Sequence, residues 1–178
     1  MAGDPARSGL VVVVPEAEPV VGHLRSRLDE NAALGGPAHV TVLFPFVPPG
    51  HLDGAVLARL AGLFAEVPSF DHRFSSTGWF GDDVVWLAPD DPEPFRDLTA
   101  RVVAAFPQHL PFEGAFGDLV VPHLTIGHEH PRPLLEAAER DVLPHLPVSG
   151  RATAVVLLTQ AEPGGRWTPA AEFPLSPR

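Results

Sequence analysis

The composition of this 178-residue chain excludes several kinds of chemistry. There is no cysteine, so disulfides, thiol nucleophiles and cysteine-based zinc or iron–sulfur sites are excluded. All 12 basic residues are arginine, which excludes Schiff-base chemistry on lysine and the lysine of a phosphate-binding P-loop. The formal net charge of −10 argues against tight binding of long nucleic acid, because such binding needs a basic surface.

The proportions of hydrophobic and charged residues, 45% and 19%, are typical of a globular protein, and the length suits one domain. The apolar run at residues 10–14 is short, ends at Pro15 and has no basic segment before it. We therefore expect no signal peptide and no membrane span, and a cytoplasmic monomer is the default.

Hydrophobic spacing predicts alternating strands and helices in the first half of the chain. A valine-rich segment indicates a strand, and the helix after it ends at Gly35 and Gly36. Later apolar side chains recur at helical spacing. In chain order the predicted elements are a strand at residues 8–14, a helix at 16–34, a strand at 39–46 and a helix at 51–66.

The second half begins with a predicted hairpin around the turn at residues 81–83. The predicted elements are strands at 70–80 and 84–88, a helix at 94–106, a strand at 119–128, a helix at 133–146, and strands at 152–160 and 167–174. The resulting order, βαβαββαβαββ, predicts an α+β fold with largely antiparallel sheets.

One four-residue pattern occurs twice, as His39-Val40-Thr41-Val42 and as His123-Leu124-Thr125-Ile126. Both copies lie in predicted strands, where successive side chains point to opposite faces. Each copy thus presents an imidazole and a hydroxyl on one face and two aliphatic anchors on the other. A single copy would be accidental in most chains, but the recurrence indicates a site in which two imidazoles and two hydroxyls face one another.

These side chains suit acid–base chemistry on a phosphate ester. An imidazole with a pKa near 6.5 can accept a proton from water, while a second, protonated one donates to the departing ribose oxygen. The hydroxyls of Thr41 and Thr125 would donate hydrogen bonds to the non-bridging phosphate oxygens. This scheme needs neither a metal nor a cofactor. The sequence leaves open whether His39 or His123 is the base.

The paired motifs resemble the signature of the two-histidine phosphoesterase superfamily. The flanking segments resemble its 2′-5′ RNA ligase-like branch: residues 38–49 (AHVTVLFPFVPP), 81–89 (GDDVVWLAP) and 121–127 (VPHLTIG). The resemblance implies one bilobal domain over residues 1–178, with two pseudo-symmetric lobes and one motif on each side of a central groove. It also implies that His39, Thr41, His123 and Thr125 are the catalytic residues.

Two other residues are candidates for substrate contacts, and a third for the shape of the groove. Trp79 would either stack on a base or pack in the core. Arg132 would either reach a phosphate or remain solvated. Gly127 is expected on the face of the second motif, where its small size would keep the groove open.

A metal-binding interpretation exists for the histidines after the second motif. Imidazoles of His123, His128 and His130, with the carboxylate of Glu129, are of the types that bind zinc. Strand alternation, however, is expected to turn His128 away from His123. We therefore expect no metal site.

The leading hypothesis is a metal-independent phosphodiesterase, a hydrolase of RNA processing that acts on a 2′,3′-cyclic phosphate or a 2′-5′-linked ribonucleotide. Its expected partner is a small nucleotide or an RNA terminus, not long nucleic acid and not a membrane. Two alternatives stay open. One is 2′-5′ RNA ligation, the reverse reaction on the same groups, and the other is a non-catalytic module that binds nucleotides or RNA ends.

Overall fold

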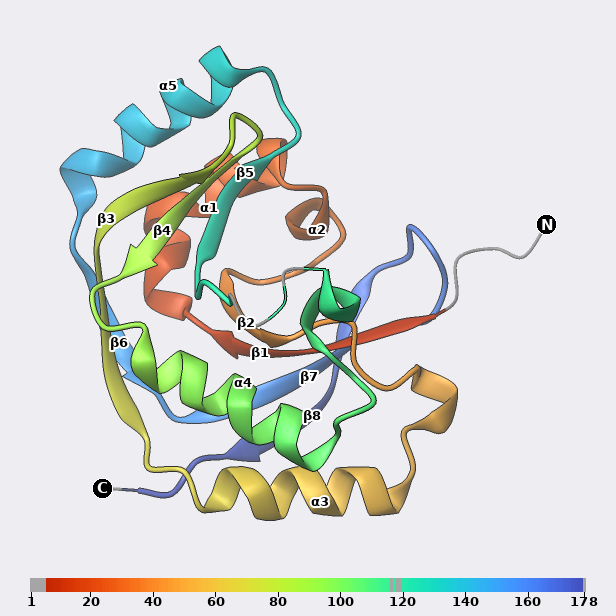
Figure 1. Ribbon diagram of the computed structural model, residues 1–178. Coiled ribbons are helices and arrows are strands. Elements are labelled where there is room, and N and C mark those ends of the chain that lie inside the picture. The colour runs from red at the N-terminus through yellow and green to blue at the C-terminus, as the bar shows by residue number, and fades with distance from the viewer. Residues whose placement is uncertain (1–5, 116, 118–119, 178) are drawn as a thin grey trace.

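Two four-stranded antiparallel sheets flanked by helices form the α+β architecture of residues 6–115, 117 and 120–177, the part of the chain that the computed structural model describes (Figure 1). The strands are β1 (Arg7–Val13), β2 (His39–Leu43), β3 (Phe70–Phe80), β4 (Val84–Pro89), β5 (Leu124–His128), β6 (Val148–Ala152), β7 (Ala154–Gln160) and β8 (Trp167–Pro174). The helices are α1 (Glu18–Leu28), α2 (Glu30–Ala33), α3 (Gly54–Ala65), α4 (Glu93–Ala105) and α5 (Arg132–Val142). None of the helices in the described ranges is long and apolar enough to cross a membrane.

The motif-bearing strands are both edge strands. One sheet has the order β2-β1-β7-β8 and the other the order β5-β4-β3-β6, so that β2 and β5 each end a sheet. These two edges lie against each other. The long strand β3 pairs with two neighbours: its first half pairs with β6 and its second half with β4.

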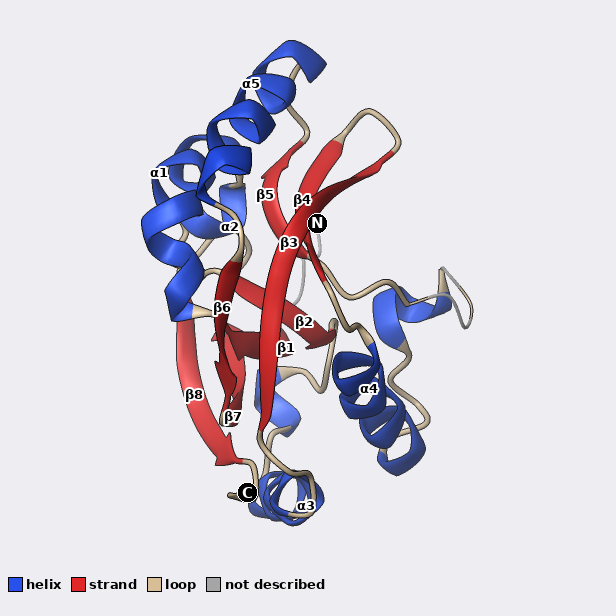
Figure 2. Cartoon of the chain, turned by 90° about the vertical axis from the view of Figure 1, so that its left-hand side faces the viewer, coloured by secondary structure: helices blue, strands red, loops and turns tan. Residues whose placement is uncertain are grey.

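The two halves of the chain exchange elements. In the first half β1 pairs with β2, and in the second half β4 pairs with β5, but β3 joins the sheet of the second half and β7 joins that of the first. The helices cross over in the same way: α1 leaves β1 yet packs against β5, and α4 leaves β4 yet packs against β2. Figure 2 shows α1 and α5 together over one sheet, far from α3 and α4. Three strands of each sheet therefore repeat one order, whereas the fourth strands, β8 and β6, are connected differently.

One continuous hydrophobic core joins both sheets to the helices. Its fully buried members come from strands and helices of both halves, for example Leu10, Val40, Leu60, Phe64, Leu87, Leu98, Leu124, Ile126 and Leu135. A smaller cluster of Val11, Leu158 and Trp167 covers the opposite face of the β2-β1-β7-β8 sheet. This opposite face is also the one that carries His39 and Thr41, because Val11 pairs with Thr41 and Val13 with His39.

The predicted helix at 16–34 is wrong in its length, because the chain breaks it at Asp29. The backbone of Asp29 is extended (φ −133°, ψ 109°), and its carboxylate accepts a hydrogen bond from the Asn31 amide as the cap of α2. An N-cap aspartate begins a new helix in this way. The other helices and the hairpin at β3 and β4 are confirmed within a few residues.

The predicted element order lacks one strand, since β6 precedes β7. Ser149 and Gly150 give β6 weak strand propensity, and its pairing with β3 overrides that propensity. The second motif strand also begins later than predicted, at Leu124, so His123 lies immediately before β5. Residues 118 and 119, the latter the predicted start of this strand, lie outside the described residues.

Candidate active site

The two motifs present their histidines and threonines as the alternation predicts. Val40, Val42, Leu124 and Ile126 are buried in the core, whereas His39, Thr41, His123 and Thr125 are half-buried. We call the side of each edge strand that carries its histidine and threonine the motif face. Neither threonine hydroxyl has a hydrogen-bond partner within the described part of the chain. Both hydroxyls are therefore available to a ligand.

Both histidine rings are held by the same backbone contact. The Nδ1 of His39 lies 2.6 Å from the carbonyl oxygen of Pro37, and the Nδ1 of His123 lies 2.7 Å from that of Val121. A carbonyl oxygen can only accept, so Nδ1 carries the proton in each ring. This contact fixes the ring orientation and leaves Nε2 of each imidazole as the group that can exchange a proton with a ligand.

Burial shifts the pKa of both imidazoles downward. For His39 desolvation is the largest cause and lowers the pKa to about 4, against an opposing effect of the Pro37 carbonyl. The positive charge of Arg25 and the nearby His123 lower it further, whereas Asp29 raises it. His39 is therefore uncharged near neutral pH.

His123 has a different electrostatic environment. Desolvation lowers its pKa, and the Val121 carbonyl opposes that effect. No charged side chain contributes to this shift among the described residues. The two rings thus share one geometry but differ in the charges around them.

Aromatic side chains stand beside His123. Trp86 lies opposite Thr125 on the neighbouring strand, and its ring centroid is 5.9 Å from that of His123. The Phe80 ring meets His123 edge to face at 4.9 Å and lies 4.8 Å from Trp86. These rings displace water from one side of the imidazole, and the motif face of this sheet is thus apolar next to the histidine.

Sequence reasoning missed Phe80 and Trp86 and chose Trp79 instead. Trp79 pairs with Val85, whose side chain is fully buried, and its indole N–H donates to Glu139 of α5 at 3.1 Å. Trp79 therefore points to the helix-covered side of the sheet, opposite the motif face. The register of the β3–β4 hairpin is enough to place Trp79 and Trp86 on opposite faces of the sheet. Only the pairing of β4 with β5 shows that Trp86 is the one beside His123.

Arg132 lies on the same helix-covered side. Its guanidinium stacks 4.8 Å from the Trp79 ring centroid and forms ion pairs with Asp82 and Glu136, the latter at 2.7 Å. These carboxylates hold the pKa of Arg132 above its ordinary value, led by the Glu136 hydrogen bond. The structure does not bring Arg132 or Trp79 together with the motif histidines.

The expectation for Gly127 is wrong because a β-bulge interrupts the alternation. The β4–β5 register shifts between Val85 and Trp86, so that Gly127 pairs with Val85 on the buried side. A Cβ at Gly127 would lie 2.7 Å from a methyl carbon of Leu135 and 3.1 Å from Cβ of Leu28. The glycine thus lets α1 and α5 pack closely on β5.

The histidines after the second motif do not form a cluster. His128 lies 3.5 Å from Glu129, and both are exposed. Among the described residues, no group of three or more histidine, aspartate or glutamate side chains is placed to hold a metal ion.

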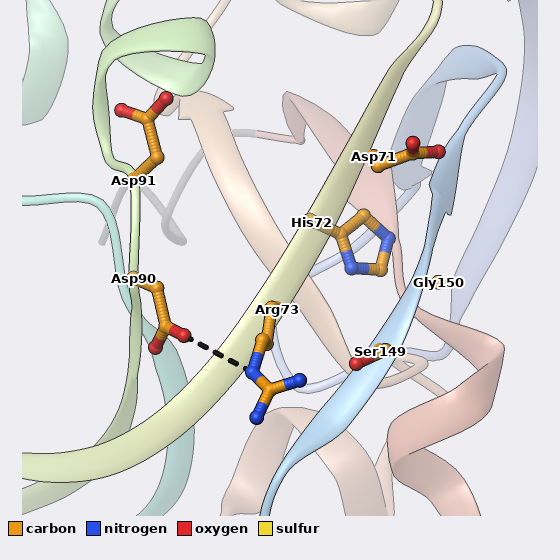
Figure 3. Close-up of a pocket in the computed structure, with 7 residues that line it drawn as sticks. All are labelled: Asp71, His72, Arg73, Asp90, Asp91, Ser149 and Gly150. Carbon is orange, nitrogen blue, oxygen red and sulfur yellow. Dashed lines mark ion pairs between the residues drawn. The ribbon is translucent and has the colours of Figure 1, made fainter.

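A separate hollow lies between β3, β6 and the segment after β4 (Figure 3). Its lining residues are Asp71, His72, Arg73, Asp90, Asp91, Ser149 and Gly150. Arg73 and Asp90 form an ion pair of 3.4 Å across it. No motif residue lines this hollow, so it is distinct from the candidate active site.

The two four-stranded antiparallel sheets and their flanking helices form a LigT-like fold. Residues 13–164 match the model of the 2′-5′ RNA ligase superfamily, and the chain belongs to that superfamily. A comparison with curated proteins finds no match.

Solved structures share the fold over nearly the whole chain. TT0787 of Thermus thermophilus is 22% identical with a TM-score of 0.65, and the match covers 97% of this chain and 99% of that one. E. coli LigT complexed with 3′-AMP is 18% identical with a TM-score of 0.59 and the same coverage. E. coli LigT complexed with NADP+ is 20% identical, also with a TM-score of 0.59 and the same coverage.

Proposed function

We propose that this protein is a metal-independent phosphodiesterase that hydrolyses a 2′,3′-cyclic phosphate or a 2′-5′ linkage at a small nucleotide or an RNA terminus. The observation that carries the proposal is that two imidazoles, at the starts of two adjacent edge strands, are held by the same backbone contact. In each ring Nδ1 is occupied by a backbone carbonyl, and Nε2 is left for proton transfer. His39 and His123 are the acid–base pair of the reaction.

The reaction follows from this pair. One imidazole accepts a proton from water at Nε2 while the water oxygen forms a bond to phosphorus. The other imidazole, protonated, donates its Nε2 proton to the ribose oxygen as the phosphorus–oxygen bond breaks. The product is a phosphomonoester with a free ribose hydroxyl, and the two histidines have exchanged protonation states.

Thr41 and Thr125 bind the phosphate in this scheme. Each lies two residues after its histidine on the same motif face, with no partner among the described residues. Their hydroxyls donate to the non-bridging oxygens, where negative charge increases in the transition state. Complexes of E. coli LigT with 3′-AMP and NADP+ support a nucleotide as the ligand class.

A panel of substrates tests the proposal. The purified protein is incubated with the four 2′,3′-cyclic nucleotides and with 2′-5′- and 3′-5′-linked dinucleotides, with and without EDTA. We expect turnover of a cyclic nucleotide or a 2′-5′ linkage that EDTA does not reduce. His39→Ala and His123→Ala should each lower this turnover by about 10²- to 10⁴-fold. Turnover that persists in both variants would contradict the proposal, as would tight nucleotide binding without turnover.

A further inference from the structure

A buried ion pair at the end of α1 contacts the segment that leads into His39. Arg25 and Asp29, one turn apart at the end of α1, form a 3.0 Å salt bridge and are 2% and 5% exposed. A second guanidinium nitrogen of Arg25 donates to the carbonyl oxygen of Gly36 at 3.3 Å. The Nε of Arg25 has no partner among the described residues.

The contact to Gly36 connects this pair to His39. Gly36 precedes Pro37, the residue whose carbonyl holds the His39 ring. The same short segment is anchored at its other end, since the Ala38 amide donates to a carboxylate oxygen of Glu18 at 2.6 Å. Side chains of α1 thus fix the segment that orients the His39 imidazole.

The two charges act on His39 with opposite signs. Arg25 disfavours the imidazolium form of His39, Asp29 favours it, and the effect of Arg25 is the larger. Desolvation and His123 act in the same direction as Arg25, and the Pro37 carbonyl acts with Asp29. The shift of His123 has neither Arg25 nor Asp29 among its causes.

Stability alone is a weak reason for burying such a pair. Removing a guanidinium and a carboxylate from water costs about as much as their mutual attraction returns, and apolar replacements are often neutral. A buried pair that orients one catalytic ring and biases its charge has a functional reason to persist.

We propose that the Arg25–Asp29 pair is a positioning element for His39: Arg25 holds Gly36, next to the Pro37 carbonyl that orients the ring, and places a positive charge on that side of the site alone. His39 is then the proton acceptor of the reaction, and His123 is the proton donor. This assignment rests on the proposed phosphodiesterase function. His39 then takes the proton of the attacking water, and His123 gives its proton to the departing ribose oxygen.

Titration of the free protein tests the electrostatic step without any substrate. The pKa values of His39 and His123 are measured by NMR in wild type, Arg25→Met, Arg25→Lys and Asp29→Asn. We expect the His39 pKa to rise by roughly half a unit or more in Arg25→Met, to fall in Asp29→Asn and to stay near the wild-type value in Arg25→Lys. Arg27→Met, an exposed position on the same helix, is the matched control and should leave it unchanged.

Opposite signs are the decisive readout, because a loss of structure would move His39 in one direction in both variants. If Arg25→Met does not fold, Arg25→Gln removes the same charge while keeping a polar side chain, and it takes the place of Arg25→Met in the comparison with Asp29→Asn. The inference is overturned if the His39 pKa does not change in the Arg25 and Asp29 variants, or if it changes by the same amount as the His123 pKa.

The leaving group tests the assignment of roles. A 2′,3′-cyclic nucleotide with sulfur in place of the departing oxygen releases a thiolate. A departing alkoxide must be protonated near neutral pH, whereas a departing thiolate need not be. We expect the loss of turnover in His123→Ala to shrink from about 10²- to 10⁴-fold to under ~10-fold on this substrate, and the loss in His39→Ala to persist. If the thio-substrate restores the turnover of His39→Ala and not that of His123→Ala, the assignment is overturned.

The two failures are distinguishable. Normal turnover by wild type with an unresponsive His39 pKa overturns the inference and leaves the proposed function intact. Absence of turnover by wild type on every ester overturns the proposed function and, with it, the assignment of roles.

Discussion

Trp86 lies directly over Gly78, its partner on the neighbouring strand. A Cβ at Gly78 would be 2.5 Å from two ring carbons of the indole, so the ring occupies the space that any other residue would need. The same indole contacts Phe80 and His123. The absence of a side chain at Gly78 thus sets where the aromatic neighbours of His123 lie.

Gly78→Ala should therefore displace Trp86 and reduce turnover. Forcing a methyl group against a packed ring costs about 1–3 kcal/mol, and the displaced indole would also release the His123 ring. Chemical denaturation, tryptophan fluorescence and kcat/KM measure these effects. Gly62→Ala is the control, because a Cβ there meets no atom within 4 Å in helix α3, and alanine should stabilise it slightly. Full activity in Gly78→Ala would show that the ring position does not matter.

The histidine pair should behave as one unit. His39→Ala and His123→Ala should each lower kcat by about 10²- to 10⁴-fold, since each removes one proton transfer. The double variant should be little worse than either single variant, because removing one member already disables the concerted reaction. Circular dichroism checks that each variant is folded. Strictly additive losses would indicate two independent contributions.

The pH dependence of kcat/KM should be bell-shaped and acidic. This parameter reports the free enzyme, in which the pKa of His39 is about 4 and that of His123 lies below its ordinary value of 6.5. Activity should fall below pH ~4 as His39 becomes protonated, and fall again as the pH rises and His123 loses its proton. An anionic substrate raises both pKa values, so the limbs of kcat should lie at higher pH. A kcat/KM optimum above pH 8 would contradict these assignments.

How much of this site the sequence predicts depends on whether strand alternation holds. It holds from His39 to Val42 and from His123 to Ile126, so the four motif side chains are placed correctly. It fails one residue later at Gly127, where the bulge shifts the register. A glycine inside a strand pattern can mark a bulge, but it does not show on which face the following residues lie.

Long-range pairing explains the other differences. Which tryptophan lies beside His123 depends on which strand pairs with β4. That strand is β5, which lies far along the chain from β4. The break at Asp29 depends on the buried partner Arg25 and on the Asn31 amide. Local propensity predicts the helices and most strands, whereas these features depend on contacts between elements.

His72 should make the folded state less stable in acid. It is 6% exposed, both ring nitrogens lack partners among the described residues, and desolvation lowers its pKa, with Glu16 opposing. Below pH ~6.5 the unfolded chain binds a proton that folded His72 does not, so the free energy of unfolding falls as the pH falls.

His72→Phe should reduce this dependence. The phenyl ring can pack between Phe74 and Phe95, which already contact the imidazole, and it leaves no unpaired polar atom. Urea unfolding at pH 7 and pH 5 measures the change. We expect the free energy of unfolding of the variant at pH 5 to exceed that of wild type by at most about 3 kcal/mol. An unchanged difference between the two pH values would mean that His72 is not responsible.

RNA binding should rest on a few local contacts. With a net charge of −10 the protein gains little from counterion release along an extended strand, so affinity for an end-blocked internal RNA should be weak and should depend little on salt. Fluorescence anisotropy over a series of salt concentrations measures the slope. Tight binding with a steep slope would indicate a basic face built from arginines and would contradict a small substrate.

The exchange of β3 and β7 between the sheets means that the chain cannot be cut into two self-sufficient pieces. A fragment that ends before β4 would leave β3 without its partners and β1 without β7. Two copies of such a half-length fragment could satisfy each other only as an intertwined homodimer, with one histidine from each subunit at the twofold axis. In a dimer of that kind both histidines would necessarily be equivalent. Joining the halves in one polypeptide removes this constraint, and a charge pair such as Arg25 and Asp29 can then act on one histidine alone.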